Sequence, residues 1–302
     1  MNQSRRRTEA FRLIPYPGRF QYRSGPRFYR RIWRLPMLAA HLLLAFPLAW
    51  WTYARRKKID ATSLRTFRWW SRVALGILGI RLKVEGCPPE EAVLVAANHV
   101  SYLDILALAS LGPGQFVAKT EMQSWPFFGL LAQWLGTLFI DRQDARASQR
   151  ILKQAADVLR QGRIVAVFPE GTTSDGTGVG EFYAAPFESA VSAGAPVLPV
   201  ALRYEDIQHP GKADRICPFI GEDSLAGHLW RLMAAAPLTL RVHFLPMLSP
   251  DAGRRQLAGE SRQMVEEALR KMEQGASVTY LKKKHHPLRD AWSSWRRRRH
   301  GS

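Results

Sequence analysis

The chain has 302 residues, of which 46% are hydrophobic, and this composition supports a folded core and excludes a disordered polymer. Lys and Arg total 44 against 25 Asp and Glu, so the net charge of +19 predicts a polyanionic partner, either nucleic acid or an anionic membrane surface. The two cysteines, Cys87 and Cys217, lie in no C-x-x-C or His-flanked motif, so we predict reduced structural cysteines and neither a metal site nor a cofactor.

The N-terminal part of the chain combines basic and apolar segments. Residues 1–34 are rich in Arg and contain no apolar stretch of the kind that a cleavable signal peptide needs. Residues 37–53 carry no charge, end in Trp50, Trp51 and Tyr53, and run into a cationic group at 55–58. An aromatic belt followed by cations is typical of a helix end at a lipid interface. The stretch is shorter than the roughly 20 residues of a full span, and Pro47 would kink it.

Residues 64–82 predict a second helix of a different kind. Arg65, Arg68 and Arg72 share one helical face, and Phe67, Trp70, Val73 and Ile77 can occupy another. This pattern predicts an interfacial helix with Arg beside phospholipid headgroups. We therefore favour a monotopic anchor of two helices within residues 1–82 over a membrane span. The alternative, two core helices of a soluble domain, explains the apolar faces but not the clustering of Trp and Arg.

From residue 83 the pattern changes to that of an α/β domain. Short β-rich apolar runs alternate with helical segments, which predicts a mixed central sheet flanked by helices across residues 83–250. The predicted strands are 92–97, 164–168, 197–202 and 238–245, and the predicted helices are 102–110, 125–134 and 145–161. Residues 251–302 add an amphipathic helix at 254–281 and a basic tail at 282–299 with two Trp, which suits contact with a membrane surface.

The first candidate site follows the strand at 92–97 and reads NHVSYLD, from Asn98 to Asp104. His99 and Asp104 are five residues apart, so they can meet only if His99 lies in the loop and Asp104 in the first helical turn, with Ser101 as N-cap. Neutral imidazole accepts a proton near pH 7, and a carboxylate on its other nitrogen fixes the tautomer. We find no Ser or Cys marked as a covalent nucleophile, so a substrate alcohol could attack instead. The alternative is that Asp104 merely caps a helix.

Two further motifs lie at the ends of strand-like runs. The run GTLFIDR is itself strand-like and ends in Arg142, which could bind a phosphate or carboxylate, or could simply pair with Asp141 on the surface. The run FPEGTTSDG turns after the strand at 164–168, and its backbone amides could hold an anion. Glu170 in this turn could bind a substrate hydroxyl or orient Arg142, although an ordinary turn explains each residue as well.

Four sequence blocks occur in this chain in the following order: NHVSYLD, FVAKTEMQSWPFFG with GTLFIDR, FPEGTTS and APVLPVAL. Together they resemble the glycerolipid acyltransferase family across residues 84–202. The resemblance implies that His99 is the general base, that Asp104 orients it, and that the family's two-helix membrane anchor precedes the catalytic domain. It also implies that Arg142, Glu170 and Gly171 help form the acceptor site and that Lys119 lines the same region. We further expect Asn98, Thr172 and Thr173 among the substrate-binding residues. The implied partners are acyl-CoA or acyl carrier protein as donor, a lysolipid as acceptor and an anionic membrane, with no nucleic acid and no cofactor.

Two departures from the family pattern bear on the acceptor. Thr173 stands where many members have Arg, and residues 182–185 read FYAA where many members have a Lys. Because these departures weaken phosphate recognition, two acceptors stay open. We rank 1-acyl-sn-glycerol-3-phosphate first, whose acylation gives phosphatidic acid. The second is lyso-ornithine lipid, because the NHVSYLD and EGTTSDG motifs also resemble the bacterial enzymes that acylate it. A non-catalytic binder of membranes or nucleic acid is the alternative of a different class. The expected location is the cytoplasmic face of the inner membrane.

Overall fold

A computed structural model describes residues 28–51, 61–112, 114–125, 128–141, 144–205, 213–221 and 223–274. Its centre is a seven-stranded mixed sheet with the order β1-β7-β6-β2-β5-β3-β4. The strands are β1 (Ile80–Glu85), β2 (Leu94–Ala97), β3 (Gln115–Lys119), β4 (Leu138–Ile140), β5 (Val165–Val167), β6 (Val197–Glu205) and β7 (Leu238–Phe244). Every pairing is parallel except that of β6 with β7, which confirms the predicted α/β class and mixed sheet. The sequence prediction missed β1 and β3.

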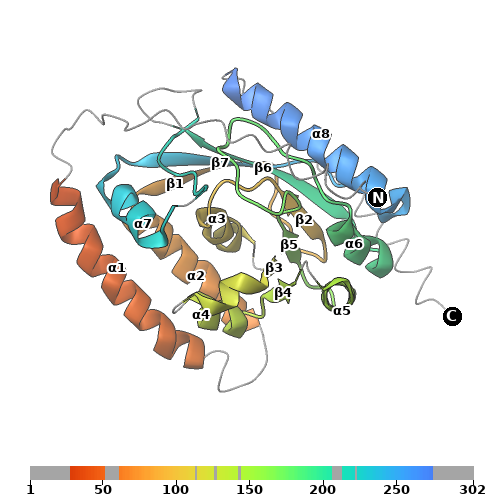
Figure 1. Cartoon of the computed structure of the whole chain (residues 1–302), viewed down its shortest axis with the longest axis horizontal. Coiled ribbons are helices and arrows are strands. Elements are labelled where there is room, and N and C mark those ends of the chain that lie inside the picture. Colours follow the sequence, from red (N-terminus) through yellow and green to blue (C-terminus); the bar gives the residue numbers. More distant parts are fainter. Residues whose placement is uncertain are drawn as a thin grey trace, which may run out of the picture.

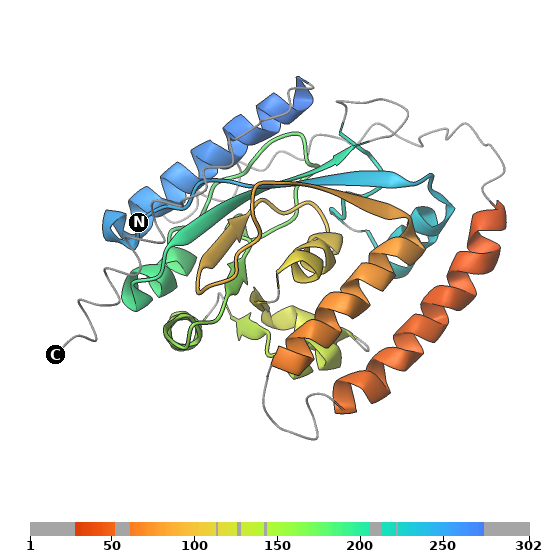
Figure 2. The same cartoon turned by 180° about the vertical axis from the view of Figure 1, so that it is seen from behind.

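Helices cover both faces of this sheet (Figures 1 and 2). They are α1 (Phe28–Ala49), α2 (Ala61–Leu78), α3 (Leu103–Leu111), α4 (Phe128–Trp134), α5 (Ala145–Arg160), α6 (Glu188–Ala193), α7 (Leu225–Ala234) and α8 (Gly253–Glu273). One core joins the sheet to α1, α2, α3 and α7, and a second core joins the opposite face to α5, α6 and α8. Strand β6 serves both cores, because Val200, Leu202 and Tyr204 face the first and Val197 and Ala201 the second.

Parallel pairing determines where functional side chains gather. Strands β2, β5, β3 and β4 are neighbours and run in the same direction, so their carboxyl ends lie along one edge of the sheet. The NHVSYLD and FPEGTTSDG motifs directly follow β2 and β5. The topology therefore brings the predicted site residues to a common edge, as is usual for open α/β sheets.

Only one of the two predicted anchor helices has the length and composition to cross a membrane. That helix is α1, in which residues Tyr29–Ala49 have a mean hydropathy of 1.5 and 22% of the apolar window is buried. It begins earlier than the predicted stretch and runs through Pro36 and Pro47. Its outward face exposes large apolar side chains, among them Ile32, Leu43 and Trp50.

The prediction for the second helix is wrong. On α2, Phe67, Trp70, Leu75 and Leu78 are buried in the core, and the helix packs along α3. Two of its arginines bond to the protein, since the guanidinium groups of Arg68 and Arg72 both donate to the carbonyl of Ser110 at 3.1 and 3.0 Å. Cations at the carboxyl end of α3 satisfy its terminal carbonyls and favour its dipole. The spacing of Arg68 and Arg72 is thus explained by their bonds to the end of α3.

Helix α1 is fixed to the body of the protein by two buried polar residues. Nη1 of Arg34 donates to the carbonyls of Leu232, Met233 and Ala235 at the end of α7. His41 stacks on Trp70 of α2 with ring centroids 4.7 Å apart. One face of α1 is thus packed on protein along its length, and the opposite face is apolar and exposed. The predicted basic segment at 1–27, the cationic group at 55–58 and the tail at 282–299 lie outside the described residues.

Candidate active site

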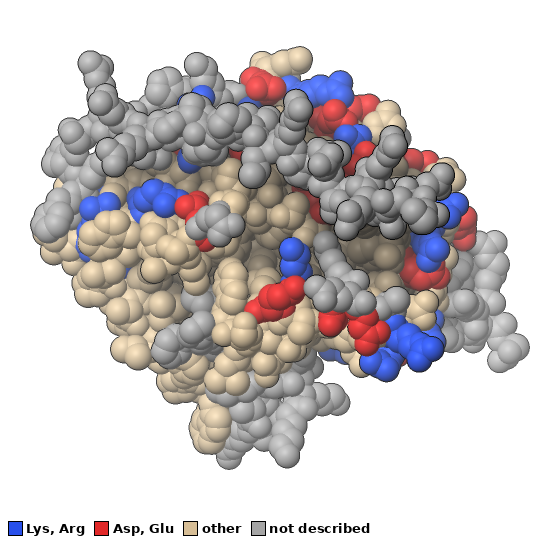
Figure 3. Space-filling view, in the orientation of Figure 1, with Lys and Arg blue, Asp and Glu red and all other residues tan. Residues whose placement is uncertain are grey.

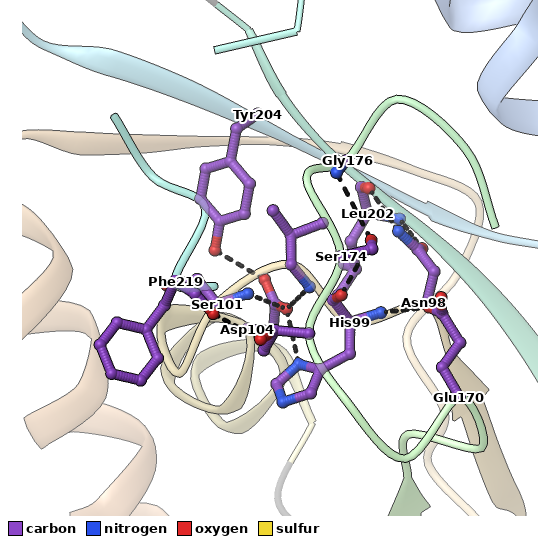
Figure 4. Close-up of polar contacts among 12 residues, drawn as sticks. Asn98, His99, Ser101, Asp104, Glu170, Ser174, Gly176, Leu202, Tyr204 and Phe219 are labelled. Carbon is purple, nitrogen blue, oxygen red and sulfur yellow. Dashed lines mark hydrogen bonds and ion pairs between the residues drawn. The ribbon is translucent and has the colours of Figure 1, made fainter. Parts of the chain in front are cut away.

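His99 and Asp104 meet at the end of β2, as their spacing predicted. Nδ1 of His99 lies 2.9 Å from Oδ2 of Asp104 (Figure 4). His99 belongs to the loop after β2, and Asp104 belongs to the first turn of α3. The aspartate side chain is completely buried, while that of His99 is 17% exposed. The pair therefore sits at the boundary between the core and the surface.

The helix that carries Asp104 begins differently from the prediction. The N-cap residue of α3 is Tyr102 and not Ser101, and no side chain caps it. The hydroxyl of Ser101 is buried without a hydrogen-bonding partner among the described residues. Asp104 instead reaches back, and its Oδ2 accepts from the backbone amides of Val100 at 2.7 Å and Ser101 at 2.9 Å. These bonds fold the loop around the carboxylate, which explains why a capping rule placed the helix start too early.

A tyrosine completes the surroundings of Asp104. The hydroxyl of Tyr204 on β6 donates to Oδ1 of Asp104 at 2.7 Å (Figure 4). Burial raises the pKa of Tyr204 well above its ordinary value, and the charge of Asp104 adds to the shift, so the hydroxyl keeps its proton. Sequence analysis missed Tyr204. Its signal is a tyrosine at an inward-facing position of a core strand, where a buried hydroxyl needs a partner.

The partners of His99 determine its tautomer. Because Asp104 accepts on both oxygens, Nδ1 of His99 carries the proton, and Nε2 is left with a lone pair. Nε2 makes no hydrogen bond within the described part of the chain. The imidazole stacks on Phe168 with ring centroids 3.9 Å apart and an interplanar angle of 15°. An oriented neutral imidazole with one free nitrogen is able to act as a general base.

Glu170 ties the two motifs together. Its Oε1 accepts from the amide of His99 at 2.8 Å, and its Oε2 accepts from the amide of Gly180, also at 2.8 Å. Desolvation raises the pKa of Glu170, and these two amide bonds oppose the shift. Both oxygens of the predicted substrate ligand are thus engaged on backbone. Its observed contacts give Glu170 a role in holding the His99 loop.

The rest of the turn after β5 also fastens that loop. Ser174 donates to the carbonyl of His99 from its amide at 2.8 Å and from its hydroxyl at 3.1 Å. Gly171 has a φ of +70°, which a residue with a side chain rarely adopts. Thr172 is exposed, and the hydroxyl of Thr173 donates to the carbonyl of Phe219. Of the predicted ligands in this turn, Thr172 has the most accessible side chain.

A stretch of chain between β6 and α7, residues 213–221, passes beside both motifs, and we call it the crossing segment. The amide of Phe219 donates to the carbonyl of Val100 at 3.0 Å. His228 on α7 holds the same segment, since its Nε2 lies 2.9 and 3.1 Å from the carbonyls of Ile216 and Cys217. Its Nδ1 lies 3.0 Å from the hydroxyl of Tyr102. Sequence analysis did not identify this segment, because nothing local predicts which distant loops it joins.

The remaining predicted ligands are not all gathered at the site. The side chain of Asn98 is fully buried and pairs with the backbone of Leu202, donating at 3.0 Å and accepting at 2.7 Å. This placement does not support a substrate contact for Asn98 and instead joins the end of β2 to β6. Lys119 is exposed at the carboxyl end of β3, the neighbour of β5. Arg142, which follows β4, lies outside the described residues. Among the described residues, no group of three or more His, Cys, Asp or Glu could hold a metal ion.

Comparison with known proteins gives a consistent result. Residues 81–203 match the family described as Acyltransferase. The chain is 37% identical over 245 residues to a lyso-ornithine lipid O-acyltransferase of Pseudomonas aeruginosa, covering 78% of this chain and 93% of that protein. It is 41% identical over 201 residues to a 1-acyl-sn-glycerol-3-phosphate acyltransferase of Neisseria meningitidis, covering 66% and 77%. The crystal structure of the 1-acyl-sn-glycerophosphate acyltransferase PlsC of Thermotoga maritima shares the fold, with a TM-score of 0.56, 20% identity and coverage of 84% and 100%.

Proposed function

Because the chain belongs to the acyltransferase family and is an O-acyltransferase that acts on lipid acceptors, we propose that His99 is the general base of the transfer. The single observation that carries this proposal is the bond between Nδ1 of His99 and Asp104, which leaves Nε2 free at the carboxyl edge of the sheet. In the proposed reaction an acyl chain moves from a thioester, on coenzyme A or acyl carrier protein, to the free hydroxyl of a lysolipid.

The steps of the proposed reaction balance without a metal or a covalent acyl-enzyme. Nε2 of His99 takes the hydroxyl proton as the oxygen attacks the thioester carbonyl, and the imidazolium is stabilised by Asp104. The tetrahedral intermediate collapses, the C–S bond breaks, and the proton moves from Nε2 to the departing thiolate. The amides of His99, Val100 and Ser101 already serve Glu170 and Asp104, so the oxyanion has to take its N–H donors from elsewhere.

We propose 1-acyl-sn-glycerol-3-phosphate as the first acceptor, with Lys119 and Arg142 as the cations that receive its phosphate. Lys119 is the last residue of β3, Arg142 comes two residues after β4 in the sequence, and these parallel strands end at the edge that bears His99. A Lys or Arg side chain at this edge suits a phosphate oxygen. Gly171 and Thr172 belong to the turn at the end of β5, where they complete the proposed acceptor site.

A specific observation favours lyso-ornithine lipid as the second candidate. Thr173 contributes a hydroxyl that already donates to the crossing segment, so this position offers a phosphate no cation. The relative from Pseudomonas aeruginosa with that printed activity is covered over 93% of its length. An acceptor that carries no phosphate would not need a cation at position 173.

We further propose that the enzyme is monotopic and rests on the anionic cytoplasmic face of the inner membrane through α1. One face of α1 is packed on α2 and α7, so lipid cannot surround the helix as it would in a simple span. The exposed face carries large apolar side chains, and the uncharged surface at the lower left of Figure 3 lies over this part of the molecule. Arg31 lies over the ring of Trp230 at 4.2 Å, which places a cation and an exposed aromatic side chain at the rim of the apolar surface.

The deciding experiment offers the purified enzyme one labelled acyl thioester with the two lysolipids side by side. We expect label in phosphatidic acid at a higher kcat/KM than in ornithine lipid. The reverse ranking would replace the first acceptor by the second, and label in neither product would reject both acceptors. When the purified enzyme is bound to anionic vesicles, we expect detergent to release it and high salt to leave it bound. A protein held by charge alone would be released by high salt.

A further inference from the structure

The carboxylate of Asp104 is a buried negative charge that neutral groups stabilise by hydrogen bonds. Its carboxylate is completely buried and receives a hydrogen bond from His99, two from backbone amides and one from Tyr204. Within the described part of the chain no Lys or Arg forms an ion pair with it. Since burial of an ionised carboxylate is costly unless its oxygens are hydrogen-bonded, each of these donors controls how much negative charge is left to act on His99.

The four donors divide unequally between the two carboxylate oxygens. Oδ2 receives the proton of His99 Nδ1 and the amides of Val100 and Ser101. Oδ1 receives the hydroxyl of Tyr204 at 2.7 Å. The amides belong to the same loop as His99, whereas Tyr204 comes from β6, a neighbouring strand. Tyr204 therefore anchors the carboxylate to the sheet independently of the loop.

Tyr204 is itself held in one place. It is buried within the core between the sheet and α3, and its backbone carbonyl accepts from the amide of Asp214 in the crossing segment at 2.9 Å. On β6 its side chain points to the same face as those of Val200 and Leu202. The phenol thus reaches Asp104 from a rigid support, which is the condition for a side chain that orients another.

We propose that Tyr204 is a positioning residue for acyl transfer, which fixes the Asp104 carboxylate and withdraws part of its charge from His99. This inference rests on the proposed role of His99 as base. When the phenolic hydroxyl is removed, Oδ1 loses its donor, and more negative charge is left to stabilise the imidazolium. The unprotonated imidazole that the reaction needs then forms only at higher pH. The carboxylate also loses its anchor on the sheet, so the imidazole is held less firmly.

Other titratable groups surround the pair and must be considered in any pH profile. They are Glu170 in the loop after β5, Cys217 in the crossing segment and Tyr102 at the start of α3. Burial raises the pKa of Cys217 and of Tyr102 above their ordinary values, so both stay neutral near pH 7. Glu170 bonds to the backbone amide of His99 and not to the imidazole, but the charges of His99 and Asp104 both act on its pKa. A control variant is therefore needed to separate its titration from that of His99.

The test compares Tyr204→Phe with Tyr102→Phe. Each variant loses one phenolic oxygen near the site, but the hydroxyl of Tyr102 lies against His228 and not against Asp104. For Tyr204→Phe we expect kcat to fall about tenfold, with an unchanged KM for the acceptor, and the acidic limb of kcat/KM to move up by about half a pH unit. For Tyr102→Phe we expect the acidic limb to stay in place. A purely structural role of Tyr204 would lower activity without moving the limb, and that result would overturn the proposal.

A second variant keeps the test decisive where Tyr204→Phe fails to fold. Replacement of Tyr204 by a ring-fluorinated tyrosine preserves its shape and makes the hydroxyl a stronger donor. We expect the acidic limb to move to lower pH, opposite to Tyr204→Phe, and an unmoved limb would again overturn the proposal. Near-normal transfer by His99→Ala would instead refute the proposed function, so the two failures are distinguishable.

Discussion

The carboxyl edge of the sheet and the side that bears α1 both bury charged side chains, but they use them in opposite ways. At the sheet edge, amides converge on the carboxylates of Asp104 and Glu170. On the α1 side, the guanidinium group of Arg34 donates to helix-terminal carbonyls, as Arg68 and Arg72 do on α2. The sheet edge leaves Nε2 of His99 available as a proton acceptor. On the α1 side, Arg34, Arg68 and Arg72 bond to carbonyls of the protein, and the outer face of α1 exposes large apolar side chains.

The proposed acyl transfer and the proposed membrane binding therefore depend on different regions of the molecule. A change at the sheet edge should alter acyl transfer and leave membrane binding intact, and a change on the face of α1 should do the reverse. Figures 1 and 2 show α1 and α8 on opposite sides of the molecule, so a charge on α8 provides a control that touches neither region.

Replacement of the base at the sheet edge, His99→Ala, should change the rate of transfer most. Loss of the base should lower kcat by about 10²–10⁴-fold, the usual contribution of acid–base catalysis. Binding to anionic vesicles should not change, because His99 lies in the loop after β2 and not on the face of α1. Steady-state rates with labelled thioester and vesicle sedimentation measure the two quantities. A rate within threefold of the wild-type rate would remove His99 from the mechanism.

The next effect comes from Leu43→Asp on the exposed face of α1. A carboxylate at an apolar interface should weaken vesicle binding about 100-fold, whereas kcat in detergent should persist. The matched control is Gly259→Asp on α8, where an added side chain meets open space. Sedimentation with vesicles of anionic lipid compares the two variants. Equal binding of both variants would show that α1 does not face the bilayer.

A smaller effect is expected from Arg34→Met, which keeps most of the length of the side chain and removes its donors. Three carbonyls at the end of α7 would lose their common partner, so the free energy of unfolding should fall by about 2 kcal/mol. The apolar outer face of α1 is unchanged, so vesicle binding should remain. Urea unfolding in detergent gives the stability. An unchanged midpoint would mean that Arg34 does not fix α1 to α7.

The smallest effect concerns pH and His228. Desolvation lowers the pKa of His228 from its ordinary value of 6.5, so between the folded and unfolded values the folded state binds fewer protons. Its contribution to stability is therefore complete above pH 6.5 and is lost as the pH falls below it, by at most about 1.4 kcal/mol per pH unit. His228→Gln should lose less stability on acidification, as measured by urea midpoints from pH 7.5 to 5. If the urea midpoints of the variant and the wild type fell by the same amount on acidification, His228 would not be the group responsible.

Much of the fold and the centre of the site followed from the sequence. Four apolar runs predicted β2, β5, β6 and β7, and the spacing of His99 and Asp104 placed one in a loop and the other in the following helix. These features are local, so periodicity and spacing are sufficient to predict them. The partial failures concerned long-range contacts. Arg68 and Arg72 have the spacing of a surface stripe, and only the packing of α2 on α3 brings their guanidinium groups to Ser110.

The remaining parts of the site have the same explanation. Tyr204 is 100 residues from Asp104, and no local pattern relates the two. Glu170 was expected to face substrate, and its engagement with the amides of His99 and Gly180 depends on how two loops fold onto each other. Ser101 satisfied a capping rule, but the reach of Asp104 back to the loop amides replaced that cap.

The stacking of Phe168 on His99 limits the direction from which a lipid can react. The two rings are nearly parallel, with centroids 3.9 Å apart, so one π-face of the imidazole is covered. The lone pair of Nε2 lies in the plane of its ring. A hydroxyl that gives its proton to Nε2 must therefore approach in the plane of the imidazole, past the edge of Phe168 and not from the face that Phe168 covers.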